Sequence, residues 1–403
     1  MRASIPLSCC LAVSACIGQE VVWRDPSPHT VRFVSVDSNV QLEVLDWGGS
    51  GRPLVLLAGL GNTAHIFDEF APKLTTAYHV FGITRRGFGA SSSPPSGYSA
   101  DRLADDVLEV LNSLKIERPV LVGHSIAGEE LSSVATRLPE RISGLIYLDA
   151  AYAPAYYDHT RGDLDIDTIY LQRELRELQA KSPGSRIPVA DMQKKLDRLE
   201  AFDSTLDPKW GPFVQELLTA DLPGFETTLR KHQPAGDQTL ITELLQTDLP
   251  GLRRDLKQAL ADASELPPQE KPPSPTGDEA KAFAGFRSWE MRVRGFATPE
   301  EEMHQQYESG PQGKIGKPRP YMRSPRVYRE ITMGVQRYTD IRVPVLAIYA
   351  PKSDPGQKAQ QKAFAIGVAR SQVVLLPKAA HHVFLSNEAD VLREMKVFLD
   401  GLK

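Results

Sequence analysis

Two hydrophobic patterns alternate along residues 28–150 and 341–403 of the chain. Short apolar runs at 54–57 and 343–349 have the length of buried strands, and strands of a parallel sheet are apolar throughout because both faces are covered. From 103 to 114, apolar residues instead recur three or four positions apart, which is the spacing of one helix face. This alternation predicts an α/β fold in which helices cover both faces of a mostly parallel sheet.

The pattern changes at both ends of this predicted sheet region. Residues 31–36 and 40–47 alternate apolar with polar positions, so we expect a hairpin at the sheet edge. Between 151 and 340 the strand-helix alternation stops, and Pro-punctuated helical sequence predicts an inserted region. Within the insertion we expect helices at 169–178, 192–199, 213–218 and 283–293, and an exposed loop at 266–277.

A nine-residue pattern occurs twice in the insertion, as ELLTADLPG at 216–224 and ELLQTDLPG at 243–251. Because Pro-Gly is turn chemistry, we interpret the pair as two helices that each end at the same turn. A duplicated helix pair is the alternative.

The chemistry is concentrated at Ser125. An apolar run at 119–122 ends there, and a helix is predicted from 126 to 138. Such a corner strains the backbone and exposes the serine hydroxyl. Gly123 and Ala127 are small, as is needed where strand and helix pass close to each other. The pattern predicts a nucleophilic serine.

A serine hydroxyl needs a base within reach and an acid that orients the base. Two later apolar strands are followed by Asp354 and His381, which gives the chain order Ser, Asp, His. We therefore expect His381 as the general base and Asp354 as the orienting acid. Asp149, at the end of another apolar run, is the alternative acid.

Six segments in this order resemble the α/β-hydrolase superfamily, in particular its cap-bearing serine hydrolases such as esterases and lipases. The resemblance covers about half the chain and implies an eight-stranded, mostly parallel sheet with a large helical cap at 151–340, between strands 6 and 7. The segments are LVLLAGLG at 54–61, RRGFGASS at 85–92, LVGHSIAG at 121–128, LIYLDAAY at 145–152, PVLAIYAPKSD at 344–354 and AAHHVFL at 379–385.

The resemblance also implies an oxyanion hole built from the backbone amides of Leu60 and Ile126, and a reaction that needs no metal and no cofactor. It favours His381 over His382, because Leu385 stands four residues further on. The chain departs from the family pattern at Ala58, often His, and at Ala127, often Gly, and its loop to Asp354 is slightly longer than usual.

Residues 1–18 predict an export leader, with Arg2 before an apolar stretch too short to span a membrane. All three cysteines lie in this stretch, so the mature protein is expected to lack disulfides. The residues before Cys16 also resemble a lipoprotein cleavage site. We expect a periplasmic or extracellular protein, either freely secreted or lipid-anchored at Cys16.

The composition limits the classes of partner that the protein is expected to bind. The chain is 41% hydrophobic and 24% charged with a net charge of −4, and no long basic block is present to track a phosphate backbone. This argues against nucleic acid as a partner. The resemblance to serine hydrolases implies a small-molecule substrate, an apolar acyl ester. Tyr152, Tyr156 and Trp289 are candidates for lining its pocket.

The sequence thus predicts a carboxylesterase-like serine hydrolase that acts through an acyl-enzyme on Ser125. Amidases or peptidases, lactonases, perhydrolases and acyltransferases use the same triad and stay open as alternatives. A non-catalytic ligand-binding protein on a hydrolase scaffold is the hypothesis from a different class.

Overall fold

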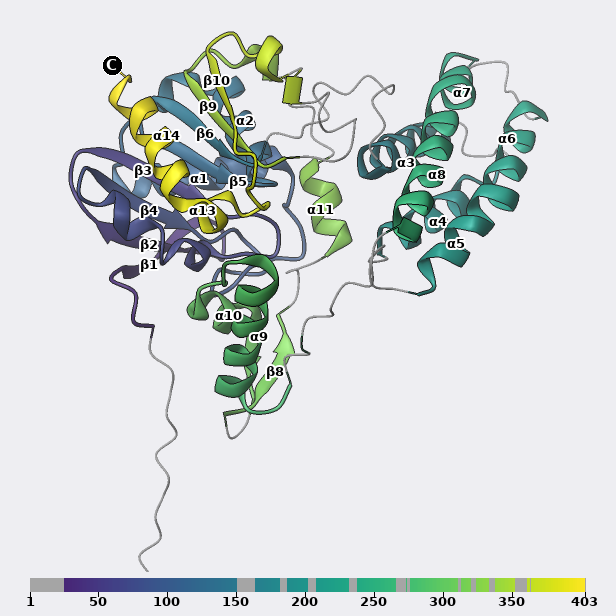
Figure 1. Ribbon diagram of the computed structural model, residues 1–403. Helices are drawn as coiled ribbons and strands as arrows, with labels where there is room; N and C mark the ends of the chain where they lie inside the picture. Colours follow the sequence, from purple (N-terminus) through teal and green to yellow (C-terminus); the bar gives the residue numbers. More distant parts are fainter. Residues whose placement is uncertain are drawn as a thin grey trace, which may run out of the picture.

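The structure is a computed structural model of the whole chain (Figure 1). The predicted export leader, including Cys16, lies outside the described residues. No helix in the described part of the chain is both long enough and apolar enough to cross a membrane. The described residues are 25–150, 164–181, 187–201, 208–231, 238–265, 273, 276–310, 313–319, 324–332, 338–351, 361–362 and 364–402.

An eight-stranded sheet forms the centre of the fold, in the order β1-β2-β4-β3-β5-β6-β9-β10. β1 and β2 are an antiparallel edge hairpin, β2 is antiparallel to β4, and every other neighbouring pair is parallel. The predicted mostly parallel eight-stranded sheet is therefore confirmed. The strands are β1 (Thr30–Asp37), β2 (Val40–Gly48), β3 (Arg52–Leu57), β4 (Tyr78–Ile83), β5 (Val120–His124), β6 (Gly144–Leu148), β9 (Val345–Tyr349) and β10 (Ser371–Leu375).

Side chains of the central strands point alternately to the two faces of the sheet, and each face has its own apolar core. In β3, Val55 and Leu57 pack with α1 and α2, whereas Leu54 and Leu56 pack with η1, η2, α13 and α14. This two-sided burial explains why the strand sequences are continuously apolar. The elements are η1 (Ala64–Phe67), η2 (Ala71–Leu74), α1 (Ala100–Leu114), α2 (Ala127–Arg137), η3 (Pro139–Arg141), α13 (Val383–Ser386) and α14 (Glu388–Asp400).

The first of these helices shows how local sequence sets the boundaries. The side chain of Ser99 accepts a hydrogen bond from the Arg102 amide and so caps the start of α1. Asp101 in the first turn is favourable to the helix dipole. Lys115 ends the helix in the left-handed conformation, with φ at +54°.

The register of the sheet brings two strand ends together. His124 at the end of β5 pairs with Leu148 at the end of β6, and Leu148 pairs with Ile348 of β9. Ser125 and Asp149, the residues that follow β5 and β6, therefore leave the sheet side by side at its carboxyl edge. In open parallel sheets this edge is where ligands bind.

The described residues between β6 and β9 are mainly helical, and Figure 1 shows two groups of elements among them. Helices α3 to α8 form a bundle around a hydrophobic core of its own, whereas α9, α10 and a β7-β8 hairpin form a second group. The four helices predicted in this region lie within observed helical segments, while α6, α7, α8, α10, α11 and the hairpin were not predicted. The elements are α3 (Leu164–Lys181), α4 (Val189–Ala201), α5 (Trp210–Glu216), η5 (Leu217–Asp221), α6 (Leu222–Lys231), α7 (Gln238–Glu243), η6 (Leu244–Asp248), α8 (Leu249–Glu265), α9 (Glu279–Arg294), α10 (Glu300–Gln306), β7 (Tyr307–Ser309), β8 (Ile315–Pro318), α11 (Pro325–Thr332) and η8 (Tyr338–Asp340).

The two Pro-Gly sequences do not end helices, so our interpretation of the repeat is wrong. Pro223-Gly224 and Pro250-Gly251 do not end helices but lie in the first turns of α6 and α8, each directly after a π-helical segment. A π turn shifts the hydrogen-bond ladder by one residue, so a proline can sit in a continuing helix where its missing N–H is tolerated. The two copies share one local structure, a helix with a π turn before Pro-Gly.

Candidate active site

Ser125 lies at the sharp corner between β5 and α2, as predicted. Its φ is +53°, in the left-handed region that residues other than glycine rarely adopt. A Cβ at position 123 would stand 2.8 Å from Leu131 Cδ1 and 3.2 Å from Ala127 Cβ, so strand and helix leave no room for a larger residue at Gly123. The corner leaves Ser125 partly exposed between buried neighbours.

The imidazole of His381 lies between Ser125 and Asp149. Its Nε2 is 2.9 Å from Ser125 Oγ, and its Nδ1 is 2.7 Å from Asp149 Oδ2. The other carboxylate oxygen, Oδ1, accepts a hydrogen bond from the Ala350 amide at 2.9 Å. A carboxylate fixed in this way favours the tautomer that carries its proton on Nδ1, which leaves Nε2 free to accept the serine proton.

The carboxylate beside His381 is that of Asp149, the alternative acid of the sequence analysis. The preference for Asp354 stays a prediction. Asp354 lies outside the described residues. Asp149 is fully buried and has a φ of +45°, so the backbone turns sharply at the end of β6 as it does at Ser125. Because β5 and β6 are neighbours in the sheet, this turn places the carboxylate on the same edge as the hydroxyl.

The loop after β3 lies against Ser125. A Cβ at position 59 would stand 3.2 Å from Ser125 Cβ and 2.7 Å from His124 Nδ1, so only glycine allows this approach. Leu60 packs on a small apolar cluster that contains Ile126. Both residues predicted to form the oxyanion hole therefore lie beside Ser125.

Arg85 fixes this loop from the side of the sheet. Its Nη2 donates to the Ala58 carbonyl at 2.8 Å and its Nη1 to the Gly59 carbonyl at 3.4 Å, while its Nε pairs with Glu130 of α2. Burial raises the pKa of Glu130, and the neighbouring Arg85 opposes that shift. A buried guanidinium that engages both carbonyls links the loop to the helix that follows the nucleophile.

Glu302 of α10 fixes the same loop from the inserted region. Its fully buried carboxylate accepts hydrogen bonds from the Thr63 hydroxyl at 2.5 Å, from the Thr63 amide, from Asn62 Nδ2 at 2.9 Å and from Gln306 Nε2 at 3.0 Å. Burial raises the pKa of Glu302 to about 7, although these hydrogen bonds oppose the shift. The sequence analysis did not identify Glu302 or the bracing contacts of Arg85, because their partners are far away in the chain.

Two further histidines surround the triad. His124 Nε2 is 3.1 Å from the carbonyl oxygen of His381, so His124 supports the backbone of the base. Burial, together with the nearby His381 and Arg294, lowers the pKa of His382 to about 3 and keeps this imidazole neutral. His382 contacts Asn62 Oδ1 at 3.4 Å.

The three candidates for lining a substrate pocket have different outcomes. Tyr152 and Tyr156 lie outside the described residues. Trp289 is buried in α9, where the guanidinium of Arg294 lies 5.2 Å from the centre of its ring. The ring centre of Phe296 lies 6.1 Å from that of His382, the residue next to His381.

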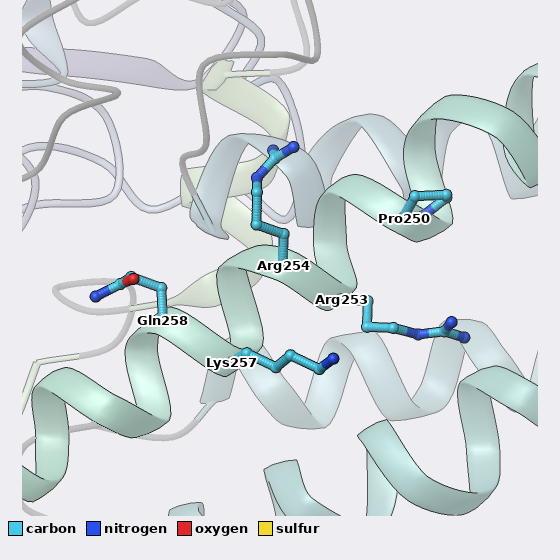
Figure 2. A pocket seen from close by; sticks show the side chains of 5 residues that line it. All are labelled: Pro250, Arg253, Arg254, Lys257 and Gln258. Atoms are coloured by element: carbon cyan, nitrogen blue, oxygen red, sulfur yellow. The ribbon is translucent and has the colours of Figure 1, made fainter.

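A hollow of about 490 Å³ lies on α8 in the bundle (Figure 2). None of Ser125, His381 and Asp149 lines it. Its wall is formed by Pro250, Arg253, Arg254, Lys257 and Gln258. The candidate active site is therefore defined by the contacts of Ser125, and this hollow is not part of it.

Comparison with models of known protein families identifies the family of this chain. The family model of the alpha/beta hydrolase fold matches residues 52–388. The chain belongs to this family. The match begins at β3 and extends into α14, so it includes Ser125, Asp149 and His381.

Several hydrolases are similar to parts of this chain. An AB hydrolase superfamily protein, YisY, from Bacillus subtilis is 34% identical over 130 residues, which are 31% of this chain and 46% of that protein. A fluoroacetate dehalogenase from a Burkholderia species is 36% identical over 107 residues, which are 25% of this chain and 35% of that protein. The chain thus spans less than half the length of these curated relatives.

A solved structure supports the same architecture. The crystal structure of an E-2-(acetamidomethylene)succinate hydrolase aligns with a TM-score of 0.55 at 16% identity, covering 93% of this chain and all of that chain. The curated hydrolase of this name from Mesorhizobium japonicum is 26% identical over 101 residues, 25% of this chain and 36% of that protein. At such identity the structural likeness shows the fold alone.

The buried carboxyl of Glu302 generates a pH prediction. Its pKa rises from 4.5 to about 7 on folding, so it contributes stability below pH 4.5 that is lost as the pH rises through 7. Relative to Glu302→Gln, the native protein should lose up to about 3 kcal/mol of unfolding free energy between these limits. Urea unfolding of both proteins across this range measures the difference, and parallel pH profiles would contradict the assignment.

Proposed function

We propose that this protein is a serine hydrolase that cleaves a carboxylic ester or a similar carbonyl substrate through an acyl-enzyme on Ser125. The observation that carries the proposal is the pair of contacts of His381, 2.9 Å to the Ser125 hydroxyl and 2.7 Å to the Asp149 carboxylate. His381 is the general base and Asp149 the orienting acid. No step of this reaction calls for a metal or a cofactor.

The geometry supports a two-step reaction. As Ser125 Oγ attacks the substrate carbonyl, its proton passes to Nε2 of His381, and the charge that builds on the imidazole is stabilised by Asp149. The substrate oxygen becomes negative and accepts hydrogen bonds from the backbone amides of Ile126 and Leu60. His381 then protonates the leaving group, and a water molecule activated by the same imidazole releases the acid and frees Ser125.

The residue type at position 125 distinguishes the proposed reaction from other reactions that proteins of this fold catalyse. A fluoroacetate dehalogenase is among the relatives, and haloalkane or epoxide hydrolysis in this fold normally uses a carboxylate as nucleophile. This chain has a hydroxyl at the corner instead. Serine supports acyl transfer, which includes ester, amide and lactone cleavage, perhydrolysis and transfer to an alcohol.

The surroundings of the triad favour an apolar acyl substrate. Leu60 and Ile126 belong to an apolar cluster next to Ser125, and Phe296 of the inserted region packs near His382. Because α10 holds the loop after β3, we assign the region between β6 and β9 the role of a cap over the site. Export, with or without a lipid anchor at Cys16, remains part of the proposal.

Replacement of the nucleophile tests the proposal directly. Ser125→Ala should lower turnover of a chromogenic ester by roughly 10³- to 10⁶-fold with the fold intact. A fluorophosphonate probe, which reacts with activated serines, should label the native protein and not this variant. Ser143→Ala, a serine that donates to the Arg118 carbonyl away from the triad, is the matched control and should keep labelling and activity. Labelling of Ser125→Ala at the native rate would contradict the assignment.

A second pair of variants tests the acid. Asp149→Asn keeps the acceptor for the Ala350 amide but presents an amide N–H to His381 Nδ1, which forces the wrong tautomer, so kcat should fall about 10²- to 10⁴-fold with KM little changed. Asp354→Asn is the matched control and should stay within a few-fold of native. If steady-state kinetics showed a larger loss of kcat in Asp354→Asn than in Asp149→Asn, Asp354 would be the orienting acid.

A further inference from the structure

A cluster of two histidines and two aspartates lies apart from the triad. Asp25 and His29 come from the segment before β1, whereas His65 is in η1 and Asp68 directly follows it. One ring nitrogen of each histidine and one oxygen of each aspartate all lie within 4.8 Å of one another. Two segments that are 36 residues apart at the closest, from His29 to His65, thus present four metal-binding side chains to one point.

The cluster is shielded from solvent. The side chains of His29, His65 and Asp68 are each 3% exposed, and that of Asp25 is 20% exposed. Asp25 Oδ2 and His29 Nδ1 are buried without a hydrogen bond of normal geometry, although Asp25 Oδ2 lies 3.1 Å from His29 Nε2 and His29 Nδ1 lies 3.0 Å from Asp68 Oδ1. Buried polar atoms in proteins are nearly always satisfied, so these two call for a partner.

The surrounding residues orient the cluster as they do around a metal. The far nitrogen of His65, Nε2, faces Glu43 Oε1 at 3.5 Å, and Glu43 in turn accepts a hydrogen bond from the Thr84 hydroxyl at 2.7 Å. Trp47 Nε1 donates to Asp68 Oδ1 at 3.2 Å. A histidine that binds a metal almost always directs its other nitrogen to a carboxylate or carbonyl in this manner.

We propose that Asp25, His29, His65 and Asp68 bind one divalent metal ion of the zinc class. Four contacts between these side chains measure 2.9 to 3.5 Å. Ligand atoms about 2.0–2.2 Å from a tetrahedral zinc ion stand about 3.3–3.6 Å apart. Asp25 Oδ2, His29 Nε2, His65 Nδ1 and Asp68 Oδ2 make three contacts of 2.9 to 3.5 Å with one another, which is close to this spacing. Two carboxylates and two neutral imidazoles together balance the charge of a divalent cation.

The position of the site suggests a structural role. A metal there joins the segment before β1 to η1, and Thr63, the N-cap of η1, is the residue whose hydroxyl and amide contact Glu302. The ion would stabilise the base of the loop after β3 without touching Ser125. Its removal is expected to lower thermal stability more than the rate of acylation.

The four side chains of the cluster can bind protons instead of a metal ion. Burial alone would lower the pKa of His29 and His65, but their contacts with the aspartates, and with Glu43 for His65, raise it to about 9 and about 12. Doubly protonated imidazoles would also balance two carboxylates. The experiment therefore has to separate a metal-bound cluster from a proton-bound one.

Metal content and thermal stability are measured on the full chain with Cys9, Cys10 and Cys16 replaced by serine, because thiols also bind zinc. After treatment with a chelator and dialysis against Zn²⁺, Mn²⁺ or Ca²⁺, we expect about one zinc per chain by plasma mass spectrometry and a Tm several degrees above that of the stripped protein. Ca²⁺, which prefers six to eight oxygen ligands, should give neither effect.

Variants identify the ligands. His29→Gln and Asp68→Asn should each lose the bound zinc and the Tm rise, whereas Glu43→Gln should keep the stoichiometry and weaken the affinity about 10- to 100-fold. His79→Gln, a histidine on β4 outside the cluster, is the matched control and should bind as the native chain does. Equal Tm with and without zinc, or zinc retained in both His29→Gln and Asp68→Asn, overturns the proposal. Fluorophosphonate labelling of Ser125, read on the stripped protein, reports on the proposed hydrolase activity separately.

Discussion

The structure of the site depends on one imidazole that is held between a hydroxyl and a buried carboxylate. His381 can contact Ser125 and Asp149 together only because β5 and β6 are adjacent and in register, which puts both residues at one edge of the sheet. Both leave their strands with positive φ, a conformation that is unfavourable for these residue types and is sustained by the packing around it. The amide of Ser125 donates to the Leu148 carbonyl at 3.2 Å, and that of Asp149 donates to the Ile348 carbonyl at 2.7 Å. The sheet therefore supplies both the location and the direction of the triad.

The loop after β3 is a second constraint, and buried charges hold it from two sides. Arg85 engages its carbonyls from the core, and Glu302 engages Asn62 and Thr63 from α10. Burying a polar or charged group is unfavourable unless it is hydrogen-bonded or paired, and here Arg85 is paired with Glu130 while the carboxyl group of Glu302 is hydrogen-bonded. Such an arrangement fixes the backbone amides beside Ser125 before a substrate arrives, which is the condition for stabilising an oxyanion without reorganisation.

The sequence predicted the sheet, the sharp corner at Ser125 and the histidine that lies beside it, because each has a local signal. Apolar runs indicate buried strands, and Ser125 stands between small residues that close packing requires. The sequence left the acid open between Asp354 and Asp149, because both follow apolar strands and chain order does not tell which strand end faces His381. Glu302 and Arg85 act through partners distant in the chain, so no spacing pattern reveals them. The Pro-Gly repeat was misread because a π turn accommodates proline inside a helix, which composition alone does not indicate.

The central claim is that an acyl group becomes covalently attached to Ser125 during turnover. Rapid acid quenching of the protein with an activated chromogenic ester, followed by intact mass and peptide mapping, tests this most directly. The account predicts a mass increase equal to the acyl group, located on the peptide that contains Ser125 and absent when His381 is replaced by alanine. Steady ester turnover by the native protein with no adduct at this serine, or with the adduct on another residue, would contradict it.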